Sequence, residues 1–484
     1  MINKKITVKL LALPGIWMGL VQLVFSMLSL FIFHDRITGK FFAPGITALV
    51  LGTGIFLILK KADISKVNFR DALIYATTTW LISGVLGALP ILGVTHISFT
   101  DAVFESVSAL TTTGATILSG LDEMPPTFLL YRQFLQWMGG LGIVIFVVAV
   151  LPMLNVGGMR LLRAETPGPL KDEKLSPRLV NTTHYLWGVY ISITIACALA
   201  YYVAGMSAYD AIAHSFTTVS TGGFSTHDAS MWYFESHEIL WICNLFMILG
   251  AINFALHFRV FHKRSLGDYA HDEETKVFIS IIVLLSIGLA LFLLFKNTYT
   301  NIFESLSFAT FHIISFITST GYGAASFGDW PTATSFLLVF AGYLDGCAGS
   351  TAGGNKIIRN IITVKIININ IKRTIHPQGV FLIKHQGKIV NADTQNAVMS
   401  FMFFAALSTT VITTMLTATG LDFWSSLTAV AACVNVLGPG FGAVGSNFQP
   451  VSDSGTWILS MAMILGRLEY LTVFTLFSPD FWRR

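Results

Sequence analysis

The hydrophobic positions of this chain gather into long runs that are separated by short polar segments. Ten of these runs approach or exceed the ~20 residues that a helix needs to cross a bilayer. The first run is too long for the core of a signal peptide, so we interpret it as a membrane helix. The ten predicted spans are residues 10–33, 42–60, 72–95, 131–154, 183–205, 239–261, 276–296, 333–368, 394–419 and 455–478.

Four shorter apolar segments lie between these spans. They cover residues 101–110, 209–218, 303–317 and 423–433, and at about 12 residues they are too short to cross. Each one is followed by small or hydroxylated residues and then by glycine. The four sequences at these turns are TTTGAT, STGGFS, TSTGYG and NVLGPGFG.

A short helix followed by extended chain predicts a re-entrant pore loop, because non-helical backbone is tolerated at membrane depth only where it lines water or protein. Four copies can surround one axis, and glycine permits backbone angles that present carbonyl oxygens to a passing ion. The pattern therefore predicts a cation filter. For any one motif taken alone, a helix end capped by a left-handed glycine is the more common explanation, but it does not account for four motifs on the same face of the membrane.

The repeated unit of span, pore helix and span predicts an all-α polytopic membrane protein. The candidate filter residues are Thr112, Thr113, Gly114, Ser220, Thr221, Gly222, Ser319, Thr320, Gly321, Val436, Leu437 and Gly438. The fourth copy lacks the hydroxyl groups of the others, so the ring is not expected to be perfectly fourfold. The predicted units are an N-terminal hairpin at 1–65 and four pore-loop repeats at 66–160, 161–265, 266–375 and 376–484.

The distribution of charge orients these spans. With ten spans, 25 of the 30 lysines and arginines fall on the side that also holds both termini. The positive-inside rule makes that side cytoplasmic and places the four turns outside. The outer segments carry thirteen acidic residues, including Asp35, Glu105, Asp122 and Asp210, against four basic residues, including Arg132. An acidic vestibule would concentrate cations, although ordinary loop charge explains most of these residues individually.

The composition agrees with this class of protein. The 484 residues are 54% hydrophobic and 12% charged, with a mean hydropathy of +0.68, which leaves too little polar surface for a soluble chain of this size. The four cysteines fall in apolar or glycine-rich stretches without the spacing of metal ligands. We therefore expect small packing residues.

The third repeat contains a further glycine-rich segment, GCAGSTAGG at 346–354, within the run 333–368. Glycine costs about 1 kcal/mol relative to alanine inside a helix, so a break is expected here. The candidate residues are Gly346, Gly349, Gly353 and Gly354. Such a break could form a loop below the filter, but small residues also allow two membrane helices to pack closely.

Arg467 lies near the middle of the last predicted span. An arginine at that depth costs roughly 2.5 to 3.5 kcal/mol on insertion scales, so it should face the pore or a partner. The candidate partners are Asp345, Glu469 and the carbonyl groups of 346–354, and the candidate role is to hold a gate closed. Snorkelling to the cytoplasmic surface is the alternative.

With these residues in view, the chain resembles the TrkH-type members of the Trk/Ktr/HKT superfamily of potassium transporters. The likeness rests on the four turns, on the extra N-terminal hairpin, and on the stretches 160–174, 214–230, 346–359 and 465–484, and it covers essentially the whole chain. It implies K⁺ as the transported ion, a potassium-channel-like fold, the inner membrane of a bacterium, and a flexible intramembrane gate at 346–354. A serine in place of a filter glycine is associated with sodium permeation in this superfamily, and all four copies here keep glycine.

Catalysis finds no support in the sequence, which has no Walker A motif, no GxGxxG entering a βαβ unit and no His/Cys cluster of the metal-binding type. No organic cofactor is expected in this chain, and no nucleic acid is expected as a partner. The resemblance implies a homodimer in the lipid bilayer that carries a cytoplasmic ring of TrkA-type NAD- and nucleotide-binding domains. Two transport mechanisms stay open, a gated potassium-selective pore and a symporter that couples potassium to protons or sodium.

Overall fold

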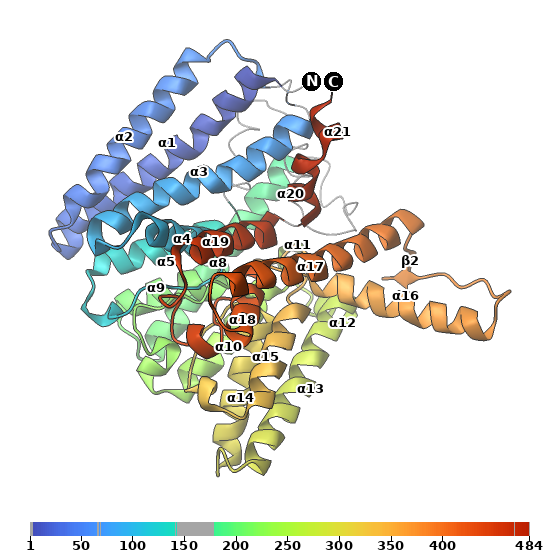
Figure 1. The fold of residues 1–484 in the computed structure, drawn as a ribbon. Coiled ribbons are helices and arrows are strands. Elements are labelled where there is room, and N and C mark those ends of the chain that lie inside the picture. Colours follow the sequence, from blue (N-terminus) through green and yellow to red (C-terminus); the bar gives the residue numbers. More distant parts are fainter. Residues whose placement is uncertain are drawn as a thin grey trace.

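The computed structural model describes residues 3–64, 67, 69–140, 142, 179–468 and 470–483. It is almost entirely helical (Figure 1). The N-terminal hairpin consists of α1 (Lys4–Leu28), a π-helical turn (Ser29–Phe33) and α2 (Thr38–Ile58). The only two strands in the described part of the chain, β1 (Lys384–His385) and β2 (Lys388–Ile389), form a small antiparallel ribbon between α16 (Ile357–Ile375) and α17 (Ala392–Ala418).

Four units follow the hairpin, and each contains a short helix between longer ones. The first comprises α3 (Phe69–Thr95), α4 (Phe99–Thr111) and α5 (Pro126–Gly140). The second comprises α8 (Leu179–Val203), α9 (Ala208–Val219), α10 (His237–Ala251) and α11 (Phe254–Lys263). The third comprises α12 (Gly267–His271), α13 (Glu273–Phe295), α14 (Ile302–Ile317), α15 (Thr332–Leu344) and α16. The fourth comprises α17, α18 (Phe423–Val434), α19 (Asp453–Leu468), α20 (Tyr470–Phe477) and α21 (Pro479–Trp482).

The four predicted pore helices are present as α4, α9, α14 and α18. Each begins at a residue whose side chain accepts a hydrogen bond from a backbone N–H of the first turn, which satisfies one of the free donors of a helix start. These N-caps are Ser98, Ser207, Asn301 and Asp422. A 3₁₀ turn follows the extended chain of every repeat, at Leu121–Glu123, Ser230–Phe234, Phe327–Asp329 and Gly442–Val444.

Six helices of the described chain are long and apolar enough to cross a membrane: Lys4–Phe33, Thr38–Ile58, Leu73–Thr95, Tyr185–Val203, Glu273–Phe295 and Ala392–Ala418. They match six of the ten predicted spans, so the chain is a multi-pass membrane protein. The second half of the predicted span 131–154 lies outside the described residues. The run 333–368 is broken as expected, into α15 and α16, and the last run contains α19 and α20.

The predicted straight span at 239–261 is wrong. The chain turns by 99° between α10 and α11. Ile252 is extended at the break, and the Asn253 side chain accepts a hydrogen bond from the N–H of Ala255 (2.8 Å) to start the new helix. The apolar run hid this break because it contains neither glycine nor proline at the turning point.

The hydrophobic core has two main parts. One joins the N-terminal hairpin to the first and fourth repeats, and the other joins the second and third repeats. The two chain ends lie together at the start of α3 (Figure 1). The N–H of Asn3 donates to Asp71 (2.9 Å), and the guanidinium of Arg70 donates to the carbonyl of Arg483 (2.7 Å). Both ends of the chain therefore lie at the same end of the helix bundle.

Candidate functional site: a ring of four glycine turns

The four turns after the pore helices have the same backbone conformation. In each, one residue with positive φ is followed two positions later by a glycine with positive φ. The first set is Thr112, Thr221, Ser319 and Val436, with φ of 62°, 53°, 53° and 56°. The second set is Gly114, Gly223, Gly321 and Gly438, with φ of 81°, 76°, 81° and 99°. The shared pattern indicates four copies of one structural motif rather than four unrelated helix caps.

The turns close into a ring, as the space around each glycine shows. A Cβ atom placed on Gly114 would lie 2.2 Å from the carbonyl oxygen of Gly222 in the next repeat. A Cβ on Gly223 would lie 1.9 Å from that of Thr320, and one on Gly321 would lie 2.1 Å from that of Leu437.

The fourth contact returns to the first repeat, where a Cβ on Gly438 would lie 2.6 Å from the carbonyl oxygen of Thr113. Each repeat thus touches the next one and the last touches the first. A side chain at any of these glycines would collide with a neighbouring carbonyl group, and positive φ also disfavours it.

The second repeat does not have the register that we expected from its sequence. The expected set was Ser220, Thr221 and Gly222, but the structure aligns Thr221, Gly222 and Gly223 with Thr112, Thr113 and Gly114. The hydrogen bonds agree, because the N–H of Gly222 donates to Thr217 (2.8 Å) as that of Thr113 donates to Ser108 (2.9 Å). Two consecutive glycines allowed both alignments in the sequence, and the backbone angles and hydrogen bonds of the structure distinguish them.

The glycine-rich segment 346–354 forms a loop that lies against this ring. The hydroxyl of Thr351 donates to the carbonyl of Val219 (3.0 Å), at the end of a pore helix. The N–H of Gly353 donates to the hydroxyl of Ser319 (2.9 Å), and a Cβ on Gly353 would lie 2.3 Å from Cβ of Val436. The loop therefore contacts the turns or pore-helix ends of the second, third and fourth repeats.

The same loop forms hydrogen bonds with the break between α10 and α11. The N–H groups of Cys347 and Thr351 donate to the carbonyls of Ala251 (2.8 Å) and Gly250 (3.1 Å), and the N–H of Phe254 donates to the carbonyl of Gly349 (3.0 Å). These bonds satisfy backbone groups that two interrupted helices would otherwise leave free.

The loop glycines have separate roles in this arrangement. Gly349 and Gly354 have φ of 72° and 56°, so a residue with a side chain would be strained there. A Cβ on Gly346 would approach the carbonyl oxygen of Ala251 to 3.0 Å. These contacts account for the density of small residues that distinguishes this segment.

Arg467 joins the loop to the first repeat. Its guanidinium donates to the carbonyl of Thr351 (3.0 Å) and to those of Gly139 (2.6 Å) and Gly140 (2.9 Å) at the end of α5. The expected contact with carbonyls of 346–354 is therefore present. Asp345, another expected partner, accepts hydrogen bonds from the N–H groups of Gly346 (2.6 Å) and Lys356 (3.4 Å), and Glu469 lies outside the described residues.

Several acidic residues assigned to an outer vestibule instead make structural contacts. Glu105 is fully buried and forms an ion pair with Arg132, which is also buried. The Glu105 carboxylate also accepts from the hydroxyl of Thr116 and from the N–H of Ile117 (3.1 Å). This pair fixes the extended chain that follows the first turn. Glu105 and Arg132 were expected among the charges of the outer segments, but α4 and α5 bury both side chains behind the turn.

A second polar cluster lies between the outer loops of the first two repeats. The Nδ1 atom of His227 contacts the carboxylate of Asp122 (2.5 Å), and its Nε2 atom lies 3.3 Å from Asp210. Burial lowers the pKa of His227, but hydrogen bonds to Asp210 and Asp122 outweigh it and raise the pKa overall. The pKa of Asp122 is lowered, since the contacts with His227 outweigh its slight burial.

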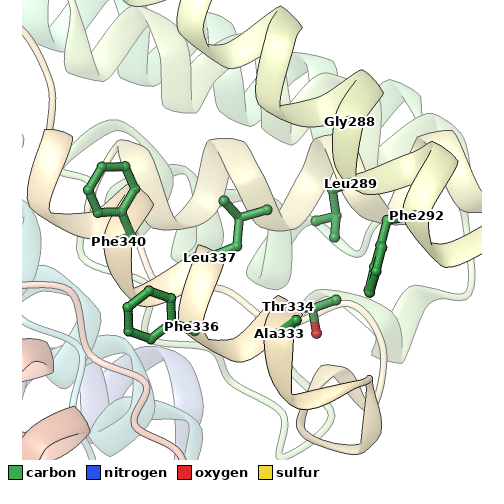
Figure 2. A pocket seen from close by; sticks show the side chains of 8 residues that line it. All are labelled: Gly288, Leu289, Phe292, Ala333, Thr334, Phe336, Leu337 and Phe340. Carbon is green, nitrogen blue, oxygen red and sulfur yellow. The ribbon is translucent and has the colours of Figure 1, made fainter.

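One cavity lies away from the ring, between α13 and α15 (Figure 2). It has a volume of about 380 Å³ and an almost entirely apolar lining. The exposed rings of Phe336 and Phe340 border it. Its lining residues are Gly288, Leu289, Phe292, Ala333, Thr334, Phe336, Leu337 and Phe340. Because it is apolar and lies on the flank of the helix bundle, it offers an ion no ligands.

The four cysteines are buried and unpaired, in agreement with their prediction as packing residues. Within the described ranges, no group of three His, Cys, Asp or Glu side chains is placed to hold a metal ion.

Comparison with known proteins identifies the fold and family. The family model described as TrkH, cation transport protein, matches residues 38–484. The chain belongs to this family. It is therefore a member of a transport family and not of an enzyme family.

Individual relatives agree with the family match. The chain is 46% identical over 422 residues to the Trk system potassium uptake protein TrkH of Vibrio parahaemolyticus, with 86% of this chain and 87% of that protein covered. It is 41% identical to TrkH of Escherichia coli, with coverage of 96% and 98%. The crystal structure of the potassium transporter TrkH from Vibrio parahaemolyticus superimposes with a TM-score of 0.90 at 38% identity and covers both chains fully. The TrkH fold, with its repeated helix and pore-loop units, is thus the fold of this chain.

Some residues of the site escaped the sequence analysis. Gln136 on α5 is buried and donates to the carbonyl of Gly222 in the second turn, while Arg132 and Gln133 on the same helix are buried against residues outside the ring. Three polar residues in a membrane-length segment were a usable signal, because such side chains are costly in lipid and normally face protein. The N-caps of the pore helices were a second signal, since all four are Ser, Asn or Asp.

Proposed function

We propose that this chain takes up K⁺ across the inner membrane of a bacterium through a gated, filter-selective pore. The observation that carries the proposal is the closed ring of four turns, in which glycine is sterically required at every contact between repeats. Carbonyl groups held in such a ring can replace the hydration shell of a cation. The relatives named above are potassium uptake proteins, which supports K⁺ as the ion.

The proposed K⁺ ligands are backbone carbonyls of the four turns. They comprise Thr112, Thr113, Gly114, Thr221, Gly222, Gly223, Ser319, Thr320, Gly321, Val436, Leu437 and Gly438. The proposed gate is the loop 346–354 together with Arg467. In support, the loop contacts the second, third and fourth repeats at the ring, and the guanidinium of Arg467 connects it to the first repeat.

Uptake of rubidium-86 into proteoliposomes that contain only this chain tests the mechanism. The potassium gradient is the sole driving force, and sodium and protons are varied in turn. Uptake that follows the potassium gradient alone supports a passive pore. Uptake that requires a sodium or proton gradient would instead establish a symporter, the second candidate, which the broken helix between α15 and α16 keeps open.

The substitution Gly114→Ser tests the filter itself. Because a Cβ at this position meets the carbonyl oxygen of Gly222 at 2.2 Å, the ring must deform. We expect the sodium-to-rubidium flux ratio to rise severalfold. Gly188→Ala is a suitable control, because nothing lies within 4 Å of the added Cβ on α8. An unchanged flux ratio in Gly114→Ser would show that Gly114 is not part of the filter.

The proposed assembly is a homodimer in the bilayer with a cytoplasmic ring of TrkA-type nucleotide-binding domains, and both termini lie on the cytoplasmic side. One face of α16 supports a protein partner, since Val364, Ile367, Ile371 and Ile375 expose half or more of their surface at helical spacing. Cross-linking of cysteines introduced at Ile371 would test whether two copies meet at this face.

We also propose that the chain divides into five units, the N-terminal hairpin and the four repeats. Their proposed boundaries are 1–65, 66–160, 161–265, 266–375 and 376–484.

A further inference from the structure

The four turns share a backbone but differ in what supports their middle residue. In the first repeat the hydroxyls of Thr111 and Thr113 lie 2.8 Å apart, and in the third those of Thr318 and Thr320 lie 2.7 Å apart. The middle residue of the second repeat is Gly222, which has no side chain to make such a pair. Leu437 in the fourth repeat also lacks a hydroxyl, but at Gly222 a side chain from another part of the chain supplies the support.

That support comes from Gln136 on α5 of the first repeat. Its amide nitrogen donates to the carbonyl of Gly222 (2.7 Å), and its amide oxygen accepts from the N–H of Phe224 (3.1 Å). The side chain is fully buried. It thus binds the backbone on both sides of Gly223, the glycine that meets the third repeat.

Gly222 and Gln136 are sterically matched. A Cβ on Gly222 would lie 2.5 Å from the Gln136 carboxamide carbon, whereas nothing prevents a side chain at this position in the other repeats, where Thr113, Thr320 and Leu437 occur. Unlike the ring glycine Gly223, Gly222 has no positive φ. The absence of a side chain at Gly222 is therefore explained by the space that Gln136 occupies.

We propose that Gln136 is a specificity-determining positioning residue, which sets the position of the Gly222 carbonyl in the ring and thereby its discrimination between K⁺ and Na⁺. This inference rests on the proposed function. Discrimination depends on the number and position of the carbonyl groups that an ion meets. Without the amide bridge, the second turn has no counterpart of the hydroxyl pairs of the first and third.

The test is the sodium-to-rubidium flux ratio in proteoliposomes that contain Gln136→Met or Gln136→Ala. Methionine has a similar volume but cannot form either hydrogen bond. We expect the ratio to rise about tenfold, which corresponds to about 1.4 kcal/mol of lost discrimination.

Gln133→Met is the matched control. Gln133 is equally buried on the same helix, and its amide also bridges two backbone groups, with Ala213 and Thr226 each at 3.0 Å. Those groups lie outside the ring, so the flux ratio should stay unchanged. Any general cost of removing a buried glutamine should affect both variants equally.

A double variant provides a rescue. Gln136→Ala opens the space beside Gly222, and Gly222→Thr in the same chain introduces a hydroxyl two residues after Ser220, as in the pairs of the first and third repeats. We expect the double variant to regain most of the discrimination that Gln136→Ala loses. Gly222→Ala alone, with Gln136 retained, should loosen discrimination because the methyl group displaces the amide.

Two results would overturn the inference. One is an unchanged flux ratio in Gln136→Met together with a raised flux ratio in Gly114→Ser. This result would support the filter but show that Gln136 does not set its selectivity. The other is loss of folded protein in Gln136→Met while Gln133→Met folds normally, which would make Gln136 a residue of general stability. An unchanged ratio in Gly114→Ser as well would contradict the proposed filter itself.

Discussion

Arg467→Ala should open the proposed gate. In the structure the guanidinium is the connection between the loop 346–354 and the end of α5, through the carbonyls of Thr351, Gly139 and Gly140. Alanine removes all three hydrogen bonds and also the positive charge beside the pathway. The contacts between the turns of the ring are untouched by this change.

The size of the effect follows from the hydrogen bond that joins Arg467 to the loop, between its guanidinium and the carbonyl of Thr351. A hydrogen bond to a charged group contributes about 1.5 to 3 kcal/mol net. Because each ~1.4 kcal/mol changes a population ratio tenfold, its loss should raise the open fraction at least about tenfold while that fraction is small. The flux should rise by the same factor, and the flux ratio of sodium to rubidium should stay constant.

Rubidium-86 uptake into proteoliposomes measures both quantities in one preparation. Arg467→Lys is the informative control, since it keeps the charge but replaces a planar fork by a compact ammonium group. Its flux should lie between those of the wild type and Arg467→Ala. A deletion within 346–354 should act in the same direction. Unchanged flux in both Arg467→Ala and the deletion would refute the gate, and a changed flux ratio would assign Arg467 to the filter instead.

Two further predictions concern the supports behind the ring. Glu105→Gln leaves the buried Arg132 without its counter-charge, so the free energy of unfolding should fall by about 3 to 5 kcal/mol, whereas joint replacement by Leu and Met should cost much less, as melting temperatures in detergent would show. The raised pKa of His227 means that its contact with Asp122 stabilises the protein below the ordinary histidine pKa of about 6.5, and that this contribution is lost as pH rises through the raised pKa. His227→Gln should therefore flatten the fall of melting temperature over that interval of pH, and an unaltered profile would exclude this pair as its cause.

The repeated part of this fold could be predicted from the sequence alone. Each pore helix is short, apolar and capped, and each turn carries the glycine that its positive φ requires, so local signals and global structure agree. The broken run in the third repeat was also predictable, because four glycines in nine residues are incompatible with a stable helix interior.

The break at Ile252 could not be predicted in the same way. No residue there disfavours a helix strongly, and the turn is stabilised by hydrogen bonds to Cys347, Thr351 and Gly349, about 100 residues further along the chain. A contact between two distant segments decided the local structure, and an apolar run cannot report such a contact. The burial of Glu105 beside Arg132 has the same origin, since neither residue alone indicates its partner.

The arrangement of the loop suggests how a partner outside the membrane could act on the ring. The exposed helix α16 begins immediately after residues 345–356, and the N–H of Ile357 donates to the carbonyl of Gly346 (2.9 Å), so the loop and the helix share a hydrogen bond. Near its middle, α16 is held to α13 through the ion pair of Lys365 with Glu273, and the turn between β1 and β2 contacts the same carboxylate through the N–H of Gln386 (3.1 Å).

A displacement of α16 must therefore either break these contacts or move the loop that lies against the ring. Energetic coupling between distant sites requires an element with two arrangements that both sites bias. The proposed gate loop is a candidate for such an element, because hydrogen bonds join it to the second and third repeats, and Arg467 of the fourth repeat joins it to the end of α5 in the first. A regulatory partner that binds α16 more tightly in one arrangement would favour that arrangement. The free-energy difference between the two arrangements would shift by the difference between its two binding free energies. The substitution Lys365→Met, which releases α16 from α13, should accordingly change the response of flux to such a partner without changing the flux ratio of sodium to rubidium.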